Sequence, residues 1–250
     1  MKFIKNKEEI KLMEKAGEIL AQVHQLLTSK IKAGVSLLEL DTIAKRFIAK
    51  SGAKSAFLGY NGYQHVLCTS VNDTVIHGIP TVYKLKDGDL LSIDAGVCYK
   101  GYFSDAAFSV VVGQKKTDLQ TKLLDVTKNA LELAIQEAKP GVNLKYIGKL
   151  IEDYVLKNNF YVVKSYCGHG IGTSLHEEPM VLNFYEPEAG DFILQEGMTI
   201  AIEPMVTVND VDLYVAEDGW SVKTEDQSLS CHFEHTILIQ KEKNKILSKL

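Results

Sequence analysis

Hydrophobic and polar positions along the chain follow two periodicities, one typical of helices and one typical of strands. Apolar residues recur at three- and four-residue spacing from Ile10 to Leu27, which predicts an amphipathic helix. Ser36 and Glu39 form a capping-box sequence, in which each side chain bonds to the backbone of the other residue, and they open a second helix. The predicted helices span about residues 7–29, 36–50, 117–138 and 144–157.

Apolar, β-prone runs lie between and after these helices. Asp87-Gly88 marks a turn before one run, and Lys100-Gly101 links that run to the next as a hairpin. The predicted strands span about residues 66–72, 90–97, 102–112, 161–165, 198–206 and 232–240.

The two halves of the chain resemble each other. Residues 32–37 resemble residues 139–144 at an offset of 107, and residues 88–94 resemble residues 197–203 at an offset of 109. The order helix, turn, helix, strands therefore occurs twice, which predicts one α+β domain over residues 1–250, built from related halves at about 7–112 and 117–240. A pseudo-two-fold axis would bring the matching acids Asp94 and Glu203 to the centre. Chance similarity of short turn motifs is the alternative.

Composition and charge restrict the possible partners. The 250 residues are 46% hydrophobic, so the chain can bury a sizeable core. Its net charge of −4 does not favour specific nucleic-acid binding. Solvated surface is the ordinary interpretation of the terminal lysines, and transient contact with the RNA-rich ribosome is the alternative. These lysines are Lys2, Lys5, Lys7, Lys11, Lys15, Lys241, Lys243, Lys245 and Lys249.

Cysteine spacing and the start of the chain predict a cytoplasmic protein. The four cysteines include no CxxC pair and no zinc-finger spacing, which indicates free thiols in a reducing compartment. The first residues lack the apolar core of a signal peptide. No apolar run is long enough to span a bilayer, so no membrane partner is expected.

Five residues with metal-ligand chemistry lie in or beside the apolar runs: Asp94, Asp105, His169, Glu203 and Glu234. The acids are expected at strand ends, and the histidine in a glycine-rich loop. Four carboxylates and one imidazole carry too much negative charge to be buried alone, and divalent cations would balance it. Oxygen ligands with one nitrogen suit manganese, iron or cobalt better than a thiolate zinc site. The set favours a two-metal hydrolase. Taken singly, each acid is more commonly a turn or surface group.

A set of longer motifs contains these residues. The motifs are Val75-Ile76-His77-Gly78-Ile79-Pro80, Ile93-Asp94, Gly101-Tyr102-Phe103-Ser104-Asp105, Tyr166-Cys167-Gly168-His169-Gly170-Ile171-Gly172, His176-Glu177-Glu178-Pro179, Thr199-Ile200-Ala201-Ile202-Glu203-Pro204, and Asp218-Gly219-Trp220 through Ser230 to Glu234-His235-Thr236. Over nearly its whole length the chain resembles the bacterial type I methionine aminopeptidases. The resemblance implies the pita-bread fold, with two pseudo-symmetric α/β halves around a central antiparallel sheet, which agrees with the internal repeat.

The resemblance also implies roles for the five ligand-type residues. Asp94, Asp105, His169, Glu203 and Glu234 would hold two divalent ions, with Asp105 and Glu234 bridging them. Glu203 resembles the acid/base that manages the proton of the attacking water. Cobalt, manganese, iron and zinc are the metals expected, and a monovalent cation is a further expected cofactor.

The histidines need separate interpretation. His77 resembles a histidine beside the scissile amide, and His176 resembles one that contacts the substrate carbonyl and steadies the tetrahedral intermediate. His232 and His235 flank Glu234 and are expected to support it or to be satisfied core groups. Taken alone, each of these histidines is more commonly structural.

A methionine pocket is the last feature implied by the resemblance. It maps onto Tyr60, Tyr63, Cys68, His77, Leu175, His176 and Trp220, with Phe57 nearby. An aromatic and sulfur-lined slot suits a flexible thioether, and ordinary core packing is the alternative. Asn61 stands where many relatives have histidine, Leu175 replaces a usual phenylalanine, and Phe57 replaces a usual cysteine.

The expected activity is hydrolytic removal of the N-terminal methionine from nascent proteins when the second residue is small, as a step of protein maturation. A monomer is expected. A proline-specific peptidase of the same fold is one alternative, but those relatives carry an additional N-terminal domain. A non-catalytic binding protein is another, but such members have usually lost metal ligands, and all five residues are present here.

Overall fold

The computed structural model describes residues 3–249, so Lys2, one of the N-terminal lysines, lies outside the described residues. Each of the four predicted helices is present within one residue of its expected ends. They are α1 (Lys7–Thr28), α2 (Leu37–Lys50), α3 (Asp118–Glu137) and α4 (Leu144–Lys157), and a short 3-10 helix, η1 (Tyr60–Gly62), follows α2. No helix within residues 3–249 is both long and apolar enough to cross a membrane.

Polar side chains fix where the helices begin. The predicted capping box of α2 is present: Ser36 Oγ accepts from Glu39 N, and Glu39 Oε2 accepts from Ser36 N at 2.7 Å. Asn6 caps α1 in the same way, and Thr117 caps α3. These bonds satisfy N–H groups that have no partner within the helix.

The strands form four antiparallel sheets within the described residues. The first contains β1 (Lys54–Ser55), β2 (Leu67–Val71), β4 (Leu90–Tyr99) and β5 (Tyr102–Val111). The second has the order β15 (Lys245–Ile246), β14 (His235–Leu238), β9 (Thr199–Ile202), β7 (Gly168–Gly170) and β8 (Glu177–Val181). The two smaller sheets are β13 (Ser230–His232), β10 (Met205–Thr207) and β6 (Tyr161–Val162), and β11 (Leu213–Val215), β12 (Val222–Thr224) and β3 (Thr74–Ile76).

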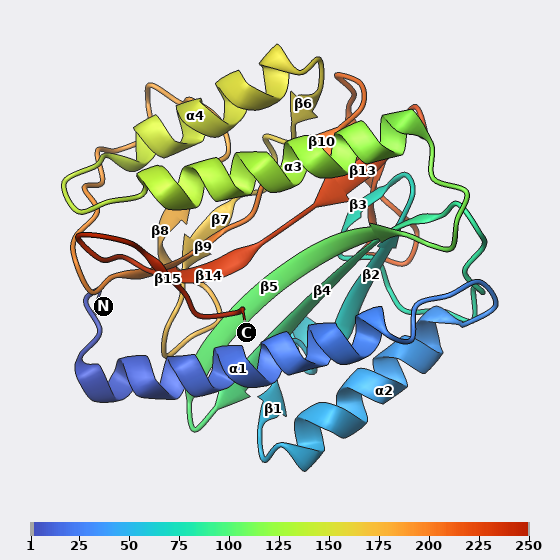
Figure 1. Ribbon diagram of the computed structural model, residues 1–250, viewed down its shortest axis with the longest axis horizontal. Coiled ribbons are helices and arrows are strands. Elements are labelled where there is room, and N and C mark those ends of the chain that lie inside the picture. The colour runs from blue at the N-terminus through green and yellow to red at the C-terminus, as the bar shows by residue number, and fades with distance from the viewer. Residues whose placement is uncertain (1–2, 250) are drawn as a thin grey trace.

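The two larger sheets meet at the centre of the molecule, between β5 and the start of β14 (Figure 1). Glu234 N donates to Ala107 O at 3.0 Å. Thr236 Oγ1 accepts from Asp105 N at 2.9 Å and donates to Asp105 O at 2.8 Å. A buried threonine hydroxyl thus completes the pairing that joins the sheets.

The internal repeat predicted from the sequence is present in the backbone. Gly34 N donates to Leu85 O and Gly141 N donates to Leu194 O, both at 2.8 Å. The two helix pairs carry these matching turns, and in Figure 1 α1 and α2 lie along one side of the sheets while α3 and α4 lie along the other. This is the pseudo-symmetric α+β arrangement that the sequence predicted.

Strand alternation decides which side of β4 faces the helices. Leu91, Ile93, Ala95 and Val97 are buried in the core beneath α1 and α2. Successive side chains of a strand point to opposite faces, so Asp94 points away from that core. The helices therefore hold the sheet from one face and leave the other for polar groups.

Two predicted strands are interrupted, and the predicted position of two acids is wrong. The run 198–206 breaks at Glu203-Pro204 between β9 and β10, since proline has no N–H to donate to a ladder. The run 232–240 breaks at 233–234 between β13 and β14. Asp94 and Asp105 lie inside β4 and β5 rather than at strand ends, and His169 lies in β7 rather than in a loop.

Five of the terminal lysines have carboxylate partners, and among these five Lys5 alone is buried, so solvated surface describes the other four. Lys5 Nζ lies 2.8 Å from Glu177 Oε2, and both side chains are buried. Four other terminal lysines lie within 4.0 Å of a carboxylate: Lys11 of Glu8, Lys15 of Glu18, Lys241 of Glu196, and Lys245 of Glu14.

Candidate active site

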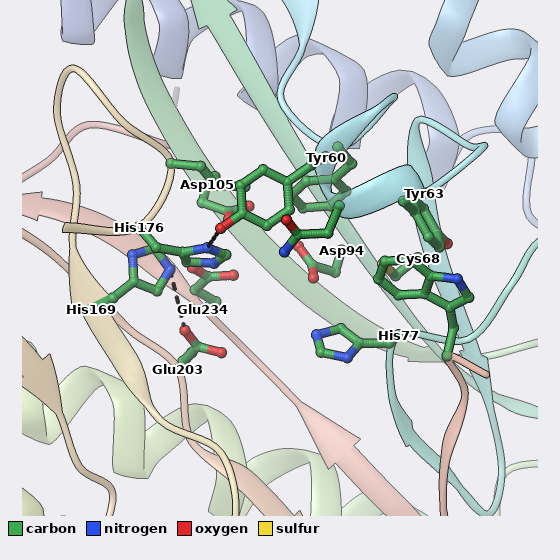
Figure 2. A pocket seen from close by; sticks show the side chains of 14 residues that line it. Tyr60, Tyr63, Cys68, His77, Asp94, Asp105, His169, His176, Glu203 and Glu234 are labelled. Carbon is green, nitrogen blue, oxygen red and sulfur yellow. Dashed lines mark hydrogen bonds and ion pairs between the residues drawn. The ribbon is translucent and has the colours of Figure 1, made fainter. Parts of the chain in front are cut away.

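One cavity of about 280 Å³ contains every residue that the sequence predicted for the metal and substrate sites (Figure 2). Its lining residues are Phe57, Tyr60, Asn61, Tyr63, Cys68, His77, Asp94, Asp105, His169, Leu175, His176, Glu203, Trp220 and Glu234. These residues come from both halves of the chain, so the cavity lies where the halves meet.

The β4–β5 hairpin brings two of the acids together. Asp94 is opposite Ala107, and Asp105 is opposite Gly96, so all four residues share one face of the hairpin. Glycine and alanine leave space beside the two carboxylates. A Cβ at Gly96 would lie 2.7 Å from Cε1 of Phe57, so the aromatic ring of the pocket occupies the room that the glycine leaves.

The second half supplies the remaining ligand-type groups. Ligand atoms of Asp105, His169 and Glu234 all lie within 4.8 Å of one another, close enough to share one metal ion. His169 Nε2 is 3.5 Å from Glu203 Oε1, and Figure 2 shows these two side chains turned toward each other. The fifth group, Asp94, adjoins Asp105. Burial raises the pKa of Asp105, and the charge of Asp94 raises it further.

Burial makes this cluster of acids unfavourable without a counter-charge. Burial raises the pKa of Asp94 to about 7 and that of Glu203 to about 8. Burial and repulsion among the carboxylates hold the pKa values of Asp105 and Glu234 well above their ordinary values. One oxygen each of Asp94, Asp105 and Glu234 is buried without a hydrogen-bond partner. Buried oxygens without donors are suitable ligands for divalent cations, so the residues present fit a metal centre.

His232 belongs to this centre, although its sequence position left its role open. Its Nε2 lies 3.6 Å from Glu203 Oε2, and the side chain is 2% exposed. His169 and His232 therefore approach the two oxygens of one carboxylate from different strands. His235 is different: its Nδ1 is 2.8 Å from Ser248 Oγ, and it does not line the cavity. In the sequence, the one signal for this placement of His232 was its position two residues before Glu234.

His77 is held in a backbone conformation that side chains rarely adopt. Its φ is +57°, in the left-handed region, directly after β3. Thr69 N donates to Gly78 O at 2.6 Å, and a Cβ at Gly78 would lie 2.3 Å from Thr69 O. This close approach fixes the turn and directs His77 into the cavity. Burial, and the charges that His232 and His176 would carry, lower the pKa of His77 to about 4, so its ring is neutral at pH 7.

His176 faces Tyr60 across the mouth of the cavity. The Tyr60 hydroxyl lies 2.7 Å from Nδ1 of His176, a contact drawn in Figure 2. The His176 ring is edge-on to the His169 ring, with centroids 4.4 Å apart. Burial lowers the pKa of His176, which favours a neutral imidazole.

An apolar slot forms the other end of the cavity. The Tyr63 and Trp220 rings meet edge to face with centroids 4.9 Å apart. Asp218 holds the turn before β12, since its carboxylate accepts from Trp220 N at 2.9 Å. Cys68 is opposite Asp94 in the β2–β4 register, and this pairing connects the slot to the acids. Leu175 closes the slot and is 3% exposed.

Comparison with known proteins agrees with this geometry. A profile of the metallopeptidase family M24 matches residues 11–241. The chain belongs to this family. It is 46% identical over 246 residues to a methionine aminopeptidase of Mycoplasma capricolum, with 98% of each chain covered. It is similar to the crystal structure of methionine aminopeptidase from Thermotoga maritima, at 40% identity, with a TM-score of 0.96 and all of both chains covered.

The M24 fold extends to proteins with other names. The prolidase from Pyrococcus furiosus matches with a TM-score of 0.80 at 25% identity. The match covers 99% of this chain but only 66% of the prolidase chain. The larger prolidase therefore contains substantial chain outside the shared M24 fold, as the sequence comparison with proline-specific peptidases expected.

The structure gives a local reason for asparagine at position 61, where the resemblance to the bacterial type I methionine aminopeptidases implied histidine. Asn61 has φ of +47° inside η1 and lines the cavity. Asparagine tolerates the left-handed region better than most residues. Asn61 thus fits the turn that presents Tyr60 and Tyr63.

Proposed function

We propose that this chain is a methionine aminopeptidase, which hydrolyses the peptide bond after an N-terminal methionine when the second residue is small. One observation carries the proposal: a single cavity has a cluster of metal-ligand groups at one end and an apolar, sulfur-containing slot at the other. Relatives that cover nearly the whole chain bear that name.

Two divalent ions are proposed, and Asp94, Asp105, His169, Glu203 and Glu234 would hold them. The buried oxygens without hydrogen-bond partners support this assignment. Divalent ions bound there would polarise the scissile carbonyl and lower the pKa of an attacking water. Cobalt, manganese, iron and zinc are the ions to test, each alone and with a monovalent cation such as potassium.

The chain's own residues supply proton transfer and charge stabilisation in this proposal. Glu203 would be ionised when cations are bound, so it can accept a proton from the water and pass it to the leaving amine. In the tautomer whose Nδ1 accepts a hydrogen bond from the Tyr60 hydroxyl, His176 carries its N–H on Nε2, where it can donate to the developing oxyanion. Neutral His77 is placed to donate to the peptide near the scissile bond.

The size and lining of the cavity support selection for methionine and for a small second residue. Ligand pockets commonly hold about 300–1,000 Å³, so this cavity of about 280 Å³ accommodates little more than one side chain beside the metal-ligand groups. An unbranched thioether fits between Tyr63, Cys68 and Trp220, and sulfur–aromatic contacts stabilise it. His176, Glu203 and Glu234 line the same cavity, which supports a limit on the size of the second residue.

The test uses metal-stripped protein and a peptide panel. Each metal is added back singly, and cleavage of Met-Ala-Ser is measured. The panel then runs Met-X-Ser with X from Gly to Leu, Phe and Lys, with Leu-Ala-Ser and an Xaa-Pro dipeptide as controls. Equal cleavage of Met-Ala-Ser and Leu-Ala-Ser would replace the proposal with a general aminopeptidase. Preference for the Xaa-Pro dipeptide would indicate a proline peptidase.

We further propose that the enzyme acts in the cytoplasm as a monomer on the N-termini of nascent chains. All four cysteines lie within the described residues and are free thiols, which suits a reducing compartment. Transient ribosome contact stays a proposal that rests on the terminal lysines, several of which are exposed.

A further inference from the structure

An ion pair joins the N-terminal segment to the active-site half that lies far away in sequence. Lys5 Nζ is 2.8 Å from Glu177 Oε2, and the two side chains are only 4% and 9% exposed. Another pair that ties α1 to a distant segment, Lys245–Glu14, is 52% and 34% exposed. Burial sets the first pair apart, because a buried charge without its partner is costly.

The second oxygen of Glu177 organises the loop that precedes β8. Its Oε1 accepts from Thr173 N at 2.7 Å, from Thr173 Oγ1 at 3.1 Å and from Ser174 N at 3.1 Å. Burial alone would raise the pKa of Glu177, but the Lys5 ammonium and these N–H donors hold it below its ordinary value. Glu177 is therefore ionised at neutral pH, and it holds Lys5 and the loop at the same time.

The loop carries two walls of the active site. Leu175 closes the apolar slot, and His176 directly precedes Glu177. At the base of the loop, Glu177 pairs with Gly170, the residue after His169, where the β7–β8 register shifts. A displacement of Glu177 would therefore be transmitted to Leu175 and His176 over one or two peptide units.

The route of the lysine side chain is built into the fold. A Cβ at Gly172 would lie 2.3 Å from Lys5 Cε and 2.6 Å from its Nζ, so the lysine occupies the place of a side chain there. The backbone of Lys5 is fixed as well, since its N–H donates to Gly197 O at 2.9 Å. Asn6 then caps α1 immediately after it.

We propose that Lys5 is a positioning residue of the active site, acting through Glu177 on Leu175 and His176. The inference rests on the proposed aminopeptidase activity. Lys5 is not among the residues that line the cavity. Its effect on turnover would come from holding the loop so that Nε2 of His176 points at the developing oxyanion.

The test is a double-mutant cycle with Lys5→Met and His176→Ala, measured on metal-loaded protein well below its unfolding temperature. Misplacement of a catalytic group by about 1 Å can cost on the order of 100-fold in rate. We expect Lys5→Met to lower kcat for Met-Ala-Ser by about 10- to 100-fold. In the His176→Ala background the same change should alter kcat less than about threefold, because the group it positions is gone.

Three further variants separate positioning from general destabilisation. Lys5→Arg keeps the charge and should restore most of the turnover. Lys245→Met removes the exposed pair and should leave kcat within about twofold of wild type. Glu177→Gln keeps the shape of the side chain but removes the charge that pairs with Lys5. If Lys5→Met does not fold, Glu177→Gln takes its place in the cycle.

Two results would overturn the inference while the proposed function stands. One is a folded, metal-loaded Lys5→Met protein with wild-type kcat. The other is a double variant whose fold-loss in kcat equals the product of the losses in the Lys5→Met and His176→Ala single variants. Failure of the wild-type protein to cleave Met-Ala-Ser would instead overturn the proposed function, and this inference with it.

Discussion

Removing the metal should make the stability of the protein depend strongly on pH between 7 and 8.5. The perturbation is chelation followed by a rise in pH. Without cations, the folded protein keeps protons on Asp94 and Glu203, whose pKa values burial raises to about 7 and 8 from ordinary values of 3.8 and 4.5. The unfolded chain has already released those protons, so the free energy of unfolding falls as pH rises.

The magnitude follows from the two pKa values. Between pH 7 and 8.5, integration of the proton difference for these two groups gives a loss of about 1.5 kcal/mol in the free energy of unfolding. For a chain of this size, that corresponds to a Tm lower by about 3–6 °C. Six histidines with lowered pKa values oppose this loss, by about 1 kcal/mol in total, because the unfolded chain still holds part of their protons at pH 7. The raised pKa values of Asp105 and Glu234 act in the same direction as those of Asp94 and Glu203, so the net free energy of unfolding still falls as pH rises.

Thermal melts with and without saturating manganese, at pH 7.0, 7.5, 8.0 and 8.5, measure the effect. A cation present at 100 times its Kd would add about 2.7 kcal/mol to the free energy of unfolding, and it would keep the acids ionised. The metal-loaded Tm should therefore stay level or rise with pH while the metal-free Tm falls. The raised pKa of the buried Cys231 thiol lowers stability at high pH in both forms, so it cancels in the difference. A metal-free Tm that is flat or rises from pH 7 to 8.5 would refute the reasoning.

Three further predictions concern single residues. Asp105→Ala should abolish both metal binding, measured by calorimetry, and turnover; full activity of that variant in chelator would contradict the dinuclear site. Glu203→Gln and His176→Ala should each lower kcat by about 100-fold or more, because both act where charge develops; steady-state kinetics that change only KM would assign them to binding. Gly96→Ala places a Cβ 2.7 Å from both Ala56 Cβ and the Phe57 ring and should cost about 1–3 kcal/mol in chemical denaturation; an unchanged midpoint would mean that both neighbours move freely.

The helices and the repeat could be predicted because their signals are local. The Ser36–Glu39 capping box lies within four residues, and the α1 periodicity lies within one helix. The hairpin turn was equally clear, since Lys100 and Gly101 both adopt positive φ as a two-residue turn requires.

The short strands around the site could not be predicted, because long-range partners stabilise them. β7 contains only Gly168, His169 and Gly170, and it is a strand because it pairs with β8 and β9. A glycine-rich tripeptide has little strand preference of its own. The burial of Lys5 was missed for the same reason, since its partner Glu177 lies 172 residues away.

The wide spacing of the site residues along the chain sets the order in which the centre can assemble during synthesis. Asp94 and Asp105 share one hairpin and can pair early, whereas Glu234, which adjoins Asp105, emerges about 130 residues later. At roughly 5–20 residues per second, that delay is about 6–26 s. During this interval the hairpin holds two neighbouring carboxylates without Glu234, and His169 emerges about half-way through it. A cation that bridges both halves can therefore bind only to a nearly completed chain, which makes metal capture a late event that follows backbone folding.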